Sequence, residues 1–151
     1  MLKFLRSAAE FRNNMNKEGL TDNAGAIHCV ERILDLLSYR IKYPGLTHVR
    51  QIRNYDGAEF SKEALIAFRQ KRSVVVEHVA PQRDFATRII SQIAAKKSDT
   101  QLKNYIKRHY RLVLLTQEES ALLNRINRSK MHKDRLGQAG IKTVSLRKKL
   151  R

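Results

Sequence analysis

The chain of 151 residues has little from which a disulfide framework, a cysteine zinc site or a membrane span could be made. Cys29 is its single cysteine, which excludes an internal disulfide and a multi-cysteine zinc site. Every apolar run is shorter than the roughly 18 residues of a membrane-spanning helix. Arg6, Glu10 and Arg12 interrupt the N-terminal segment, which argues against a secretory signal peptide. We therefore expect a cytoplasmic protein that does not enter a membrane.

Acidic residues are scarce. The chain has 14 Asp and Glu against 31 Lys and Arg, and its formal net charge at pH 7 is +17. Residues 96–151 hold 16 of the basic residues and only 4 of the acidic ones. Lys and Arg bind phosphates and release counterions whatever the base sequence. This charge predicts nucleic acid as the partner, DNA first and RNA as the alternative. The basic stretches lack the apolar face with aromatic anchors that an interfacial membrane helix has.

Apolar residues at three- and four-residue spacing predict helices over much of the chain. The predicted helices cover residues 1–17, 23–43, 62–71, 83–95, 98–108 and 116–126. The helix over 23–43 is predicted to be the longest, and Leu122, Leu123 and Ile126 are predicted to be buried. Ser98 with Gln101, and Thr116 with Glu119, have the spacing of a capping box. Residues 45–58 are expected to form mostly loop.

Two short apolar runs predict strands. One covers residues 74–79, which begin with three valines, and the other covers residues 110–115. The expected fold is α+β and dominated by helices, with N-terminal helices and a small two-stranded β element. We divide the chain into a helical N-terminal region, residues 1–60, and a region over 61–151 with a basic C-terminal tail. The two regions are expected to form one compact unit.

Glu77 and His78 stand out among the apolar neighbours of the first predicted strand. Burying such a pair costs free energy unless each side chain has a partner. A carboxylate suits Mg²⁺, and an imidazole can accept a proton from water near neutral pH. The chain has no HExxH motif, no GxSxG motif and no glycine-rich phosphate loop. This pair is therefore the candidate for a catalytic site.

The second predicted strand and the helix that follows it supply further polar groups. Thr116 begins the helix, and Ser120 and Asn124 lie one turn apart, so they share a face.

The sequence Glu-His-Val-Ala-Pro at 77–81 resembles a segment of the endonuclease I family. The strand–Thr116–helix unit is similar to the second half of the ββα-metal motif of His-Me finger, HNH-like nucleases. The resemblance implies that Glu77 and Asn124 bind a divalent cation, Mg²⁺ first, and that His78 is the general base. It thereby implies a metal-dependent endonuclease that hydrolyses phosphodiester bonds in DNA, or alternatively in RNA.

Basic residues near these segments are candidates for contacts with the nucleic acid. They are Arg83, Lys107, Arg108, Arg111, Arg125, Arg128 and Lys130. Tyr105 and Tyr110 are further candidates, for stacking on a base, with a place in the core as the alternative for Tyr105.

Two alternatives to a nuclease remain open. One is a basic protein that binds DNA or RNA without cleaving it. This alternative is favoured by Ser120, which stands where nucleases often have a second helix ligand, and by the lack of a match to the motif's middle asparagine. The other is an interaction factor that docks an acidic protein partner. Residues 1–60 are the candidate region for a protein partner or a homodimer.

The nuclease hypothesis carries a geometric condition. Adjacent residues of a strand face opposite sides of the sheet, so Glu77 and His78 converge only if the strand bends between them. Pro81 makes an irregular strand end plausible, because proline has no N–H for the ladder. Without such a bend, Glu77 is a surface carboxylate and His78 an ordinary hydrogen-bonded residue on the other face.

Overall fold

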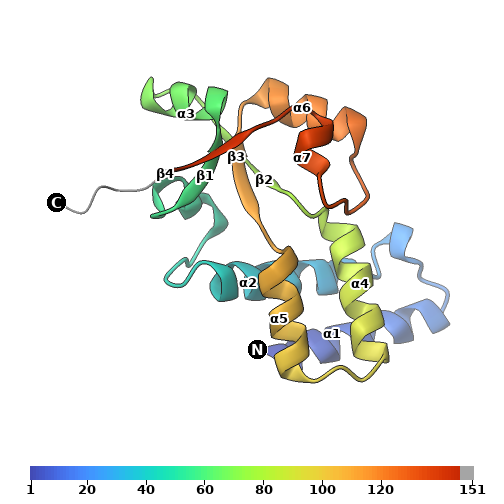
Figure 1. Cartoon of the computed structure of the whole chain (residues 1–151). Coiled ribbons are helices and arrows are strands. Elements are labelled where there is room, and N and C mark those ends of the chain that lie inside the picture. Colours follow the sequence, from blue (N-terminus) through green and yellow to red (C-terminus); the bar gives the residue numbers. More distant parts are fainter. Residues whose placement is uncertain (147–151) are drawn as a thin grey trace. The chain divides into compact units, whose positions relative to one another are not determined.

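A computed structural model describes residues 1–146 (Figure 1). The protein is a mixed α+β protein dominated by helices, as the sequence predicts. The chain forms two compact units. Unit 1 contains residues 1–44 and 82–110, and unit 2 contains residues 45–81 and the described residues from Arg111 onward. Among residues 1–146, no helix combines the length and the apolar composition that crossing a membrane requires.

The boundary expected at residue 60 is not a position at which the chain passes from one unit to the other. The chain passes between the units after Pro44, after Pro81 and after Tyr110. Residues 82–110 belong with the N-terminal helices because the helices they form pack against the helix that ends at Lys42.

Unit 1 is built from four helices and one 3-10 turn. They are α1 (Leu2–Lys17), η1 (Asp22–Ala24), α2 (His28–Lys42), α4 (Gln82–Ala94) and α5 (Asp99–His109). Their apolar faces meet in a core that includes Leu5, Leu34, Ile89 and Ile106. The helix predicted over 23–43 starts late, because Gly25 has a left-handed φ of 108° that separates η1 from α2. As a result α1, with 16 residues, is longer than α2, with 15.

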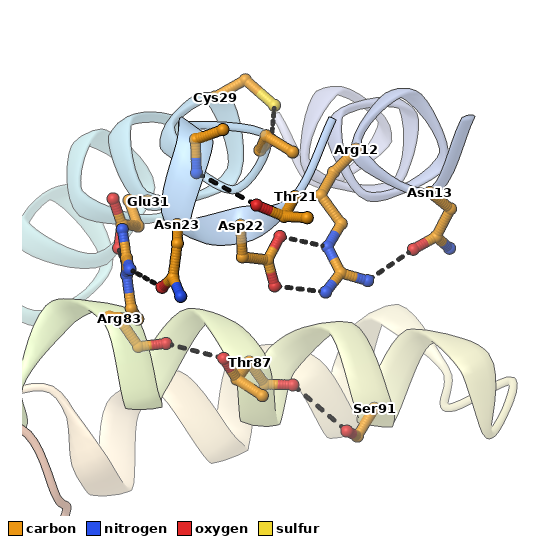
Figure 2. Close-up of polar contacts among 12 residues, drawn as sticks. Arg12, Asn13, Thr21, Asp22, Asn23, Cys29, Glu31, Arg83, Thr87 and Ser91 are labelled. Atoms are coloured by element: carbon orange, nitrogen blue, oxygen red, sulfur yellow. Dashed lines mark hydrogen bonds and ion pairs between the residues drawn. The ribbon is translucent and has the colours of Figure 1, made fainter. Parts of the chain in front are cut away.

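Polar contacts join the helices of unit 1 at their edges (Figure 2). The Arg12 side chain in α1 donates from Nε to Asp22 Oδ1 at 2.8 Å and also contacts Asp22 Oδ2. Arg83 at the start of α4 pairs with Glu31 of α2 at 3.3 Å and donates to Asn23 at 3.2 Å. These contacts tie η1 to α1 and to α4.

Tyr110 lies in the core of unit 1. Its hydroxyl donates to Asp35 Oδ1 at 2.8 Å, and its ring lies near those of Tyr43 and Phe85. Burial, followed by the charge of Asp35, raises the pKa of Tyr110 above its usual range. The expectation that Tyr110 stacks on a base is wrong, because its ring is covered by neighbouring helices.

Unit 2 contains a four-stranded sheet within the described residues, in the order β2-β3-β1-β4. The strands are β1 (Ala58–Ser61), β2 (Val75–His78), β3 (Leu112–Leu115) and β4 (Thr143–Leu146). The sequence predicts a two-stranded element at the positions of β2 and β3, and the structure pairs these two strands antiparallel. The sequence does not predict β1, which runs parallel to β3, or β4, which pairs antiparallel with β1. Each of these two strands has only four residues. That is too few for the alternation of apolar and polar side chains to identify a strand among polar neighbours.

Helices cover the two faces of this sheet. Val113 and Leu115 of β3 pack against Leu123 of α6 (Gln117–Ile126), Leu136 of α7 (Arg135–Gln138) and Ile141. Leu123 is buried, but Leu122 and Ile126 are 38% and 47% exposed. The prediction that all three are buried is therefore wrong for two of them, because Leu123 is the one residue of α6 that is buried.

The opposite face carries Phe60 of β1 beside Leu114 of β3. The Phe60 ring lies 5.2 Å from that of Phe68 in α3 (Lys62–Arg69). The 3-10 helix η2 (Val49–Asn54) also packs against β1 and β2. It lies within residues 45–58, which the sequence predicts as mostly loop.

The predicted helix caps are confirmed. Both halves of the capping box are present at Ser98 with Gln101 and at Thr116 with Glu119. Ser61 is the N-cap of α3, and its hydroxyl accepts from Ala64 N and donates to Glu119. Glu119 thus joins the N-termini of α3 and α6.

We expect Asp22→Asn to destabilise the protein by about 1 kcal/mol at neutral pH, since it removes a partly exposed ion pair. Arg12 lowers the pKa of Asp22 below its ordinary 3.8. The ion pair therefore stabilises the fold above about pH 4, and this contribution is lost as the pH falls through the pKa of the folded state. Urea unfolding of both proteins at pH 7 and at about pH 3 checks this. An equal difference in stability at the two pH values contradicts it.

Candidate functional site

The guanidinium of Arg135 lies at the centre of the candidate site, and its residue is only 1% exposed. Its Nε donates to the carbonyl oxygen of Asn127 at 2.8 Å, and Nη1 donates to the carbonyl oxygen of His78 at 2.7 Å. Its Nη2 donates to Asn124 Oδ1 at 3.2 Å and lies 3.7 Å from Glu77 Oε1. One side chain therefore connects β2, α6 and the segment that follows α6.

Glu77 reaches this centre from the strand β2. It lies on the same face of β2 as Val75 and Val79, the face that packs against α6 and α7. Its Oε2 accepts from the Ser120 hydroxyl at 3.0 Å, while Oε1 faces Arg135. The Asn124 amide nitrogen donates to the Ser120 carbonyl at 2.9 Å, which orients its oxygen toward Arg135. The structure thus brings Glu77 and Asn124 to one place, although they are far apart in the sequence.

The His78 side chain is on the other face of the sheet. The strands β2 and β3 pair without interruption from Val75–Leu115 to His78–Leu112, and Val79 N donates to the Arg111 carbonyl just beyond. This regular ladder leaves no bulge between Glu77 and His78, so their side chains point to opposite faces. The bend that the nuclease hypothesis needs is not present. His78 contributes its carbonyl oxygen, not its imidazole, to the contacts of Arg135.

The electrostatics of the centre are those of a buried ion pair. Burial lowers the pKa of Arg135, and the nearby charge of Glu77 opposes that shift. An arginine remains protonated at neutral pH even so. The Glu77 side chain, 18% exposed, supplies the balancing negative charge. Since a buried charge without a partner is costly, each of the two depends on the other.

The residues at this centre do not fit a divalent cation as they are arranged. The Asn124 oxygen accepts from Arg135, and both Glu77 oxygens already face partners. A metal ion there would lie beside a buried positive charge. Within residues 1–146, no group of three or more His, Cys, Asp and Glu side chains is placed to hold a metal. Binding of Mg²⁺ by Glu77 and Asn124 stays a prediction.

Two of the predicted nucleic-acid contacts are engaged in ion pairs. Arg83 pairs with Glu31 in unit 1. Arg111, which is half-buried in unit 2, pairs with Glu59 and donates to Thr143 Oγ1 at 3.0 Å. Lys107 and Arg108 are exposed in the last turn of α5 in unit 1.

The other three, Arg125, Arg128 and Lys130, are exposed and lie close together in the sequence of unit 2. Arg125 is in the last turn of α6, and the other two belong to residues 127–134, which connect α6 to α7. We call residues 127–134 the basic loop. It also contains the exposed Lys133, which the sequence analysis did not single out.

Arg135, at the centre of the candidate site, was not predicted from the sequence. In the sequence it is one of many basic residues near the C-terminus, and no periodicity or motif distinguishes it. Only its burial and its contacts, which depend on the fold, identify it.

No protein-family model matches this chain, and no similar protein was found among the curated proteins or the solved structures. The interpretation of the site therefore depends on its own geometry. Its geometry is that of a cation built into the protein, held by one carboxylate, one amide and the backbone carbonyl groups of His78, Val79 and Asn127.

We expect Arg135→Met to lower the free energy of unfolding by about 3 kcal/mol or more. The substitution leaves the Glu77 carboxylate without its cation and removes the donor to three backbone carbonyl groups. Urea unfolding measures the change. Arg125→Met is the matched control on an exposed position, and its effect should stay within about 0.5 kcal/mol. Similar stabilities for the two variants contradict a central role for Arg135.

Proposed function

We propose that this protein binds nucleic acid through its phosphate backbone, without cleaving it. The observation that carries the proposal is how the few acidic residues are used. Six of them pair with arginines inside the described structure: Asp22, Glu31, Glu59, Glu77, Asp84 and Asp99. The surface therefore keeps a large excess of basic side chains over acidic ones.

An excess of this size has a physical consequence. Like charges on one surface repel each other and destabilise the compact state unless an anionic partner balances them. A nucleic acid supplies a regular row of phosphates, and each contact with Lys or Arg releases a counterion. The chemistry of the surface fits DNA or RNA, because both present the same phosphodiester backbone.

A metal-dependent endonuclease is the second candidate. The specific observation in its favour is that Glu77 and Asn124 meet near the end of β2, as the nuclease resemblance implies. Two observations support the binding proposal instead. Arg135 lies between the two residues, and the imidazole of His78 lies on the other face of the sheet.

We expect the protein to bind a labelled DNA duplex and a labelled single-stranded RNA with strong dependence on salt. If about four phosphates are contacted, affinity should fall by roughly 100-fold between about 50 and 200 mM NaCl. Fluorescence anisotropy measures this. An affinity that does not change over this range, or an absence of binding at the lowest salt, contradicts the proposal. Preferential binding to an acidic protein would then favour the interaction factor.

Incubation of plasmid DNA and RNA with Mg²⁺, Mn²⁺ or EDTA separates the two candidates. The binding proposal expects the nucleic acids to stay intact under all three conditions. Cleavage that needs the metal and is lost in His78→Ala would establish the endonuclease and overturn the proposal.

A further inference from the structure

We infer that the basic loop, residues 127–134, together with Arg125, is a preformed surface for nucleic-acid phosphates, and that buried Arg135 positions it. The inference rests on the proposed function and adds which surface makes the contacts and what holds it in shape.

The basic loop is closed at its base. Arg135, directly after the loop, donates from Nε to the carbonyl of Asn127, its first residue. The loop is also held internally, because Asn127 Oδ1 accepts from Lys130 N at 3.0 Å and His132 Nδ1 accepts from Asp134 N at 3.1 Å. A loop of this length whose ends meet is a compact surface feature and not an open linker.

The same guanidinium anchors the loop to the rest of unit 2. Its Nη1 reaches the carbonyl of His78 in β2, and its Nη2 reaches Asn124 of α6. Glu77 supplies the opposite charge. A planar fork with five N–H donors can make all these contacts at once, whereas the single ammonium of a lysine cannot. The position of the loop therefore depends on an arginine at this point.

The cations of this surface are available to a partner. Arg125, Arg128, Lys130 and Lys133 are all exposed, and no ion pair within residues 1–146 involves them. The acidic residue of the loop, Asp134, lies against Gly137, where an added Cβ would be 2.2 Å from Asp134 Oδ1. Its carboxylate is thus next to the backbone of α7.

The arrangement fits an extended polyanion. Exposed lysines and arginines that are close together along one segment can contact the phosphates of a nucleic-acid backbone whatever its sequence. A loop that is already ordered loses less conformational entropy on binding, so its contacts contribute more to affinity. Removal of Arg135 should therefore weaken binding even though its guanidinium is buried and touches no phosphate.

The first experiment assigns the surface. We compare the triple variant Arg128→Gln, Lys130→Gln, Lys133→Gln with a matched triple variant in α5, Lys103→Gln, Lys107→Gln, Arg108→Gln. Both remove three charges. We expect the loop variant to bind DNA and RNA at least about 10-fold more weakly, with a salt slope smaller by about 3, and the α5 variant to keep most of the slope. The reverse result, or equal losses in both, overturns the assignment.

The second experiment tests the positioning role. Arg135→Lys keeps the charge but loses the fork, and Asn127→Ala removes only the side-chain contact to Lys130 N. In both variants we expect faster trypsin cleavage within the basic loop and binding weaker by about 3- to 10-fold, at a temperature where circular dichroism shows a folded protein. Asn127→Ala leaves the contacts of Arg135 in place and tests the order of the loop by itself. If Arg135→Lys does not fold, Asn124→Ala, which removes one side-chain acceptor of Arg135, takes its place with the same expected result. Wild-type binding and wild-type loop cleavage in the folded variants would overturn the positioning role and leave Arg135 with stability alone.

The outcomes also separate this inference from the proposed function. If the wild-type protein shows no salt-dependent binding, the proposed function fails and the inference fails with it. If the wild-type protein binds but the loop triple variant binds equally well, only the inference fails.

Discussion

Unit 2 depends on a buried arginine whose charge must be balanced. Arg135 is almost fully covered, so its guanidinium needs a carboxylate and several acceptors close by. Glu77 supplies the carboxylate, and Asn124 and the carbonyl groups of His78 and Asn127 supply the acceptors. These groups come from three parts of the chain, namely β2, α6 and the basic loop, so satisfying one side chain fixes a strand, a helix and a loop relative to each other within unit 2.

This constraint also changes how the Glu-His segment is interpreted. A glutamate in an apolar strand needs a positive partner, and the nuclease resemblance assigns that role to a metal ion. In the structure the partner is Arg135, a fixed cation that belongs to the protein. A metal ion and a guanidinium can each balance the charge of the Glu77 carboxylate. In the structure Glu77 and Asn124 both face Arg135. The donors of this guanidinium are engaged inside the protein, so Arg135 holds neighbouring segments together and does not itself reach a partner.

Features that depend on residues close together in the sequence were predicted correctly. The capping boxes at Ser98 and Thr116 and the valine-rich strand β2 were predicted because each depends on neighbours within a few residues. The strand β4 was missed because its pairing partner, β1, is distant in the sequence and both strands have four residues. The burial of Leu122 and Ile126 was predicted wrongly for a related reason. Helical spacing shows which residues share a side of α6, and only packing decides how wide the buried row is.

The features of the candidate site also fall into those that the sequence determines and those that only the fold decides. The sequence by itself determined the helix-dominated α+β class, the large positive charge and the unusual position of Glu77, since these follow from composition and from residues close together in the chain. Only the tertiary structure decided that Arg135 is buried while Arg125, Arg128 and Lys130 are exposed. It also decided that Glu77 and His78 face opposite sides of a regular ladder. The physical reason is that arginines have the same chemistry wherever they stand in a chain, and whether one is a buried partner or a surface cation depends on which distant residues the fold brings around it.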